Sequence, residues 1–120
     1  MRVYRVHHQE DVQIGPFSWR FDFRECNRDL SRHYGRLPTP YGVWDDLPDW
    51  SWNCGAATLA ELADWFPALA VRWLYRNGFT ASAFEVPRTF TRRGGQQVIF
   101  CLDVAERLFE VDLHRYRRLT

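Results

Sequence analysis

The chain has 120 residues, an apolar share of 46%, an aromatic share of 17% and a formal net charge of +1. This length predicts a single domain, residues 1–120, with one modest core, and this composition excludes a disordered chain. No apolar run is long enough to span a bilayer and no signal peptide is visible. We therefore expect a soluble cytoplasmic protein without a membrane partner.

Charge is unevenly distributed along the chain. Residues 41–70 hold five acidic residues and no arginine, whereas both flanking segments are mildly basic. This pattern argues against a nucleic-acid partner and favours a molecule with one acidic, aromatic surface. The three cysteines, Cys26, Cys54 and Cys101, lie far apart, which supports neither a disulfide framework nor a zinc ribbon. The adjacent residues His7 and His8 would point to opposite sides of a strand and could not bind one metal ion together, so no metal site is expected.

Residues 2–8 alternate bulky β-forming residues with polar ones, which predicts an opening strand. Val3 and Arg5 would point to one side of this strand, and Tyr4 and Val6 to the other.

From residue 19 to residue 34, apolar residues recur at helical spacing, which predicts a helix. Its other side carries arginines interleaved with acidic residues. Such a side either grips phosphates along a groove or is a solvated surface, and the mixture of both signs favours the solvated surface.

Residues 35–55 contain three prolines, three glycines, three tryptophans and three aspartates. This mixture is too irregular for a helix or strand and too aromatic for a solvated linker. It predicts a long ordered loop, and two roles remain open for it: a binding surface, or a satellite core in which the tryptophans cover the main one.

Two helices are expected after this loop. Thr58 is a candidate N-cap, and Glu61 three residues later completes a capping box. Pro67 is suited to begin the second helix, and the Asn77-Gly78 pair is suited to end it.

Strands are expected over residues 79–86, 96–102 and 109–116, because β-forming residues recur there between turn signals. The order of elements predicts an α+β fold: a single domain with a mostly antiparallel sheet of about four strands and two to three helices. Within the strand over 96–102, alternation sends Gln97 to the same side as Ile99, opposite Phe100.

Cys54 is a candidate nucleophile. It precedes a helix start, where a thiolate feels the positive end of the helix dipole, and His114 follows it in the chain, an order that papain-like thiol hydrolases use. The alternative is a small residue packed beneath the loop. The rest of the hydrolase signature is missing, which favours packing.

Three segments in order, VYRV, CGAATLAEL and QQVIF, resemble the layout of ADP-ribosyltransferase-like domains. The resemblance implies a site for NAD or a related nucleotide, with Tyr4 and Arg5 binding the cofactor and Arg5 pairing with its pyrophosphate. Thr58 would shape the nicotinamide pocket, and Gln97 would stand at the catalytic glutamate. An amide can hydrogen-bond a ribose but cannot stabilise a cationic transition state by charge, so the resemblance implies weak or no transferase activity.

The chain also resembles an uncharacterised family of small bacterial and phage proteins. The shared motifs are VYRV, GP[YF], CGxx[ST]L…WF, EVP and QVxF, and here they fall within residues 3–6, 15–17, 54–66, 78–87 and 97–100. These motifs cover most of the chain. The resemblance implies one common fold and names no activity.

The sequence therefore supports two hypotheses of different classes, an enzyme and a binding protein, and the choice between them stays open. The first is the nucleotide-binding domain, with NAD as the possible cofactor. The second is a non-enzymatic phage or mobile-element protein that inhibits a host protein by docking on a basic partner. The acidic and aromatic docking residues would be Tyr41, Trp44, Asp45, Asp46, Asp49, Trp50 and Trp52.

Overall fold

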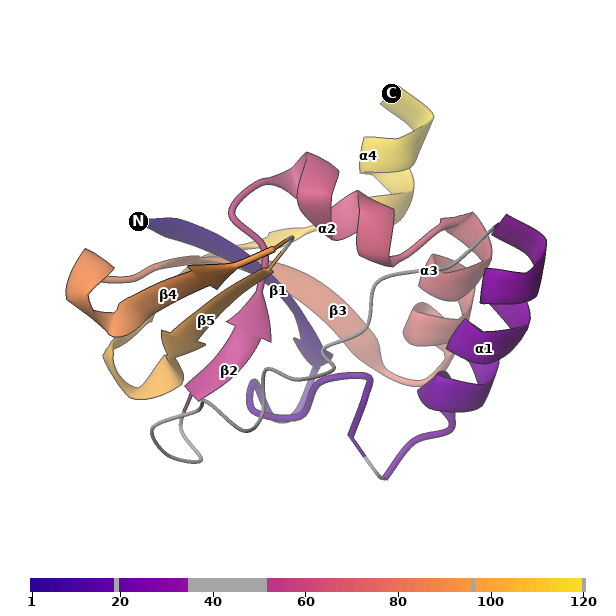
Figure 1. Ribbon diagram of the computed structural model, residues 1–120, viewed down its shortest axis with the longest axis horizontal. Helices are drawn as coiled ribbons and strands as arrows, with labels where there is room; N and C mark the ends of the chain where they lie inside the picture. Colours follow the sequence, from indigo (N-terminus) through magenta and orange to yellow (C-terminus); the bar gives the residue numbers. More distant parts are fainter. Residues whose placement is uncertain (19, 35–51, 96, 120) are drawn as a thin grey trace.

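A computed structural model describes residues 1–18, 20–34, 52–95 and 97–119 of the protein, and these residues form four helices and two three-stranded antiparallel sheets (Figure 1). The α+β prediction is confirmed. The first sheet has the order β1–β3–β6, with β1 Arg2–His8, β3 Phe79–Glu85 and β6 Glu106–Val111. The second has the order β2–β5–β4, with β2 Trp52–Gly55, β5 Gln97–Cys101 and β4 Thr91–Gly94. The helices are α1 Phe23–Tyr34, α2 Leu59–Trp65, α3 Ala68–Arg76 and α4 Leu113–Leu119.

The two sheets meet at β1. Tyr4 and Ala56 exchange backbone hydrogen bonds of 2.8 and 2.7 Å, which fastens the residue after β2 to the free edge of β1. Beside this bridge, Val3 packs with Val98 and Phe100 in a cluster that joins the first sheet to the second. One sheet of about four strands was therefore the wrong arrangement, because β2 and β4 pair with β5 in a sheet of their own.

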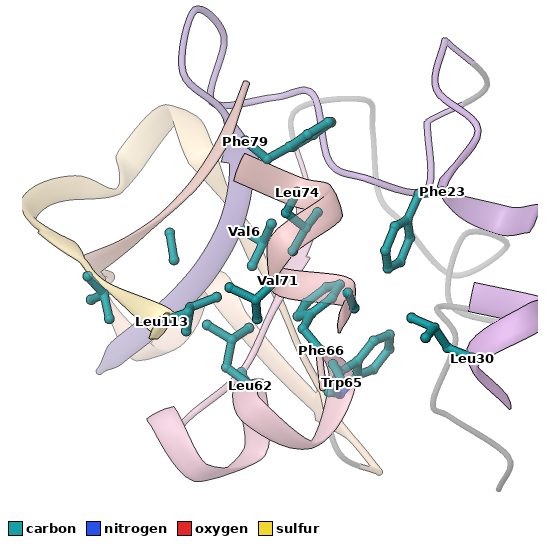
Figure 2. Close-up of a cluster of buried hydrophobic side chains, with 14 residues drawn as sticks. Val6, Phe23, Leu30, Leu62, Trp65, Phe66, Val71, Leu74, Phe79 and Leu113 are labelled. Atoms are coloured by element: carbon teal, nitrogen blue, oxygen red, sulfur yellow. The ribbon is translucent and has the colours of Figure 1, made fainter. Parts of the chain in front are cut away.

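The largest core lies between the first sheet and the helices (Figure 2). Its side chains come from all four helices and from strands β1, β3 and β6. Helix α1 packs against α3, as Figure 1 shows at the right of the view. The ring centroids of Phe23 and Trp73 lie 5.1 Å apart across this contact. The alternation predicted for β1 is confirmed, since Val6 belongs to this core and Val3 to the inter-sheet cluster.

Local signals set the ends of α2 and α3. The Thr58 hydroxyl accepts a hydrogen bond of 3.1 Å from the Glu61 backbone, so Thr58 caps α2 as predicted. Pro67 precedes the first residue of α3. Gly78, with φ of 80°, follows the end of α3 at Asn77, in a backbone conformation that glycine adopts without strain.

Two predicted elements were wrong in extent. The first helix begins at Phe23 rather than at residue 19. The final strand ends at Val111, and the segment predicted to continue it to residue 116 is helical. The physical reason is Asp112, whose carboxylate accepts a hydrogen bond of 3.1 Å from the Arg115 backbone and so begins α4.

Two short strands lie where loops were expected. β2 occupies the end of the predicted loop over residues 35–55, and the rest of that loop lies outside the described residues. β4 forms a hairpin with β5, and Gly95 in the turn has φ of 59°. None of the helices in the described ranges has the length and hydropathy needed to cross a membrane.

Candidate functional site

Arg5 is the predicted site residue with the most extensive contacts. Its side chain on β1 is only 3% exposed, and four of its five N–H groups donate within the protein. The acceptors are the carbonyl oxygens of Val12 (2.9 Å), Gln13 (2.9 Å) and Cys54 (2.7 Å) and the side-chain oxygen of Asn53 (3.3 Å). Burial lowers the pKa of Arg5 to about 10, and the group stays charged at neutral pH.

The chain around Arg5 folds to supply these acceptors. The segment after β1 turns back on the strand, so that the His8 backbone bonds to Ile14 at 2.8 Å. Gly15 approaches the guanidinium so closely that an added Cβ would lie 3.3 Å from Nη2. Arg5 therefore joins three segments, namely β1, the turn after it and β2. This is the arrangement of a buried structural arginine rather than of a phosphate ligand.

A small pocket lies beside Arg5. It has a volume of about 40 Å³, and its apolar walls include Phe17, Leu62, Trp65 and Phe66. Such a volume holds water, whereas pockets for nucleotide-sized ligands measure roughly 300–1,000 Å³. The described residues around Arg5 therefore do not form a site that fits NAD.

The other residues of the predicted nucleotide site do not gather around Arg5. Gln97 lies on the side of β5 opposite Val98, which faces the first sheet, so Gln97 faces away from the side on which Arg5 lies. Its Oε1 is buried without a hydrogen-bond partner. Thr58 uses its hydroxyl as the cap of α2, and Tyr4 packs against the helical core.

Cys54 is poorly suited to nucleophilic chemistry. Burial raises the pKa of its thiol to about 11, although the charge of Arg5 opposes this shift. The thiol therefore stays protonated at neutral pH, where a nucleophile needs the thiolate. His114 lies in a different place, on α4, where its ring stacks on Tyr75 with centroids 4.9 Å apart.

Trp52 is the member of the predicted docking loop that the structure describes. It is 8% exposed and packs with Ile99 and Cys101, and the Arg92 guanidinium lies 5.4 Å from the centroid of its ring. Trp52 therefore belongs to a small core on the second sheet and is not an exposed anchor. The docking residues from Tyr41 to Trp50 lie outside the described residues.

Sequence reasoning missed an exposed surface along β6. Three apolar side chains are exposed there, Val104 (39%), Leu108 (37%) and Phe109 (48%), and Arg2 lies 5.5 Å from the Phe109 ring centroid. The same segment carries four exposed acidic residues and one arginine: Asp103, Glu106, Glu110, Asp112 and Arg107. We call residues 103–112 the β6 strip. Apolar residues adjacent at 108 and 109, instead of alternating, were the signal that could have indicated it.

Polar side chains of the β6 strip also reach inward. Arg107 Nε donates to the Ser82 hydroxyl at 3.1 Å, and the Thr80 hydroxyl donates to Glu110 at 2.5 Å. His7 is fully buried beside them, with Nε2 2.8 Å from the Ser82 hydroxyl. Its Nδ1 donates to the carbonyl of His8 at 2.7 Å, so Nε2 is the acceptor in the neutral ring.

Burial lowers the pKa of His7, and the neighbouring positive charges of Arg5 and Arg107 lower it further. The backbone contact with His8 and the charge of Glu110 act in the opposite direction and are outweighed. The buried ring therefore favours its neutral form, which matches the hydrogen bonds on both of its nitrogens.

One family model matches the chain, over residues 1–114, and its description is "Bacteriophage T4 Y00F protein". Neither a curated protein nor a solved structure matches.

Proposed function

The chain belongs to the family of the bacteriophage T4 Y00F protein, and on that premise we propose that it is a non-enzymatic binding protein that docks on a basic partner protein through the β6 strip. This is the second of the two functions considered from the sequence, with the docking surface assigned to different residues.

The exposed apolar side chains of the β6 strip carry this proposal. Among the described residues, five large apolar side chains are exposed, and three of them, Val104, Leu108 and Phe109, lie within six positions of the chain. Scattered single apolar side chains are normal on protein surfaces, whereas three within a short segment that also carries charged residues favour an interaction site. Phe109 is the natural anchor, because aromatic side chains bury the most surface on binding.

The charge of the strip indicates the kind of partner. Residues 103–112 hold four acidic residues against one arginine, a net charge of −3. An acidic surface steers a basic partner towards it and repels an acidic one. The acidic residues between 41 and 50 have the same preference by charge alone.

The nucleotide-binding function stays a prediction that the geometry does not favour. Its phosphate ligand, Arg5, already donates four hydrogen bonds inside the protein, and the adjacent pocket is about 40 Å³. A nucleotide would have to displace those bonds. We accordingly expect no shift of the unfolding temperature with NAD or ADP-ribose, and a reproducible shift that saturates with ligand concentration would support the enzyme instead.

Site-specific photo-cross-linking tests the proposed function. A photoreactive benzoyl-phenylalanine replaces Phe109 in one variant and Leu69, an exposed apolar residue on α3, in a matched control. In a bacterial host lysate we expect one cross-linked protein from position 109 and none from position 69. That protein, purified and basic, should bind the chain directly, and Phe109→Ser should weaken binding by about tenfold or more because an aromatic anchor is lost.

Two results would overturn the proposal. The first is equal cross-linking from positions 109 and 69, which would indicate non-specific contact. The second is a purified partner whose affinity is unchanged by Phe109→Ser. Phe109 is 48% exposed, so the substitution should leave the fold intact, and thermal unfolding of the variant checks this.

A further inference from the structure

An open pocket lies where β6 meets α3 and α4. It has a volume of about 510 Å³ and is lined by Tyr75, Thr80, Glu110, Val111, Asp112 and His114. We call it the end pocket. Its volume falls within the range of roughly 300–1,000 Å³ that is usual for ligand sites. Two of its lining residues, Glu110 and Asp112, belong to the β6 strip, so the pocket and the proposed docking surface are continuous.

The chemistry of the end pocket suits a cation. Glu110 accepts a hydrogen bond from the Thr80 hydroxyl through Oε1, and Asp112 accepts one from the Arg115 backbone through Oδ1. Neither carboxylate lies within ion-pair distance of a basic side chain whose position the structure describes, a set that excludes the side chains after residue 116. Two carboxylates thus lie at one opening, and a carboxylate has a second oxygen that can accept a further hydrogen bond.

The aromatic wall of the end pocket adds shape selectivity. The rings of Tyr75 and His114 stack with an interplanar angle of 24°. Burial raises the pKa of Tyr75, so its phenol stays neutral, and its oxygen accepts a hydrogen bond of 3.2 Å from the Leu113 backbone. A planar guanidinium can stack on aromatic rings and donate to two carboxylates together, which the compact ammonium of lysine does less well.

The backbone of β6 is a second feature, beside the end pocket, that a peptide could bind. β6 is an edge strand that pairs only with β3 in the first sheet. No backbone hydrogen bond from Glu106–Val111 to another described segment lies on its outer side. The side chains of residues 106–110 are all exposed, so both faces of the strand are accessible beside this edge. Extended peptides add to such edges through main-chain bonds and gain specificity from side-chain pockets.

We infer that an extended segment of the basic partner pairs with β6 as a fourth strand of the first sheet and inserts an arginine side chain into the end pocket. This inference rests on the proposed function and specifies its partner. The net charge of −3 over residues 103–112 and the two carboxylates that line the end pocket favour a basic segment over a second copy of this chain, whose own β6 is acidic.

Peptide selection tests the inference. A library of short random peptides is selected against the immobilised chain, and the affinity of the enriched peptides is measured by fluorescence polarisation. We expect an alternating apolar sequence with one arginine at a constant position. Replacing that arginine by neutral citrulline should weaken binding by about tenfold or more, because charge-assisted hydrogen bonds are lost. Methylating alternate backbone nitrogens of the peptide should have a similar effect.

Matched variants of the chain locate the contact. Glu110→Gln and Asp112→Asn remove the charges of the end pocket and keep an acceptor for Thr80 and for the Arg115 backbone. Each should weaken the peptide by about tenfold. Asp64→Asn removes one exposed charge on α2, outside the β6 strip, and should change the affinity by less than about twofold.

Four results would overturn the inference: no enriched peptide, enriched peptides without a basic residue, affinity unchanged by Glu110→Gln and Asp112→Asn, or affinity unchanged by backbone methylation. A dimer of the free chain that Phe109→Ser dissociates would assign the edge to a second copy and also overturn it. If Phe109→Ser abolishes peptide binding while the two pocket variants do not, the proposed function survives and only the inference fails.

Discussion

The two edges of the first sheet use their polar residues in opposite ways. On β1, Arg5 and His7 are 3% and 0% exposed, and their hydrogen bonds are made inside the protein. On β6, every side chain before Val111 is exposed. The first edge is closed by the bridge between Tyr4 and Ala56, whereas the second has no strand beside it in the described ranges.

This difference teaches that residue type alone does not indicate a ligand site. An arginine in a first strand is suited to a phosphate, yet Arg5 is already engaged by three carbonyl groups and one amide. Glu110 and Asp112, at the end of β6 and just after it, line an open pocket and have no ion-pair partner among the side chains that the structure describes up to residue 116. The acidic edge is therefore the one with binding capacity left.

The largest expected effect is at the closed edge. Arg5→Met should lower the free energy of unfolding by about 3–5 kcal/mol, because it leaves buried carbonyl groups without donors. Arg72→Met, on the exposed side of α3, should change it by less than about 0.5 kcal/mol. Urea unfolding measures both. Equal, small effects of the two substitutions would show that Arg5 does not stabilise the fold, and Arg5 would again be a candidate ligand-binding residue.

A smaller effect is expected where β2 approaches β1. Gly55→Ala would place a Cβ 2.6 Å from Val3 Cγ1 and 2.7 Å from the Tyr4 carbonyl oxygen. Because backbone lies on one side, the strand must move, and we expect a loss of about 1–3 kcal/mol. Gly94→Ala in the exposed hairpin has no atom within 4 Å of the added Cβ and serves as the control. Thermal unfolding that gives the same result for both would contradict a closed edge.

The smallest expected effect is a pH dependence from His7. Its pKa in the folded chain lies below the ordinary 6.5, so below pH 6.5 the unfolded chain binds a proton that the folded chain does not. The free energy of unfolding should therefore decrease as the pH falls through 6.5 and be fully recovered above it. His7→Asn should remove this part of the dependence. Stability curves of the two chains that run parallel between about pH 5 and pH 7.5 would contradict the assignment.

Much of the fold could be predicted because it depends on local signals. The alternation of residues 2–8 predicted β1, and Thr58 and Gly78 predicted the limits of the two central helices. The prediction of a strand over residues 109–116 was wrong because the cap at Asp112 competes with the alternating pattern. β4 could not be predicted, since its arginines and glycine form a strand only by pairing with β5.

The candidate site was less predictable than the fold. The resemblance to ADP-ribosyltransferase-like domains led to Arg5 and Gln97. In the structure Arg5 lies on β1, and Gln97 lies on the side of β5 that faces away from it. The acidic character expected of a docking surface is present on β6, but in different residues. Exposure of Phe109 depends on β6 being the outer strand of its sheet, and no sequence pattern gives the order of strands.

The sequence by itself determined the strands and helices that follow from alternation, caps and turns, because those signals act within a few residues of the chain. Only the tertiary structure decided which polar groups are already used. The acceptors of Arg5 are backbone carbonyls at residues 12, 13 and 54, and every residue type carries such a group. Folding alone brings them to the guanidinium, and folding alone places the carboxylates of Glu110 and Asp112 together at one open pocket.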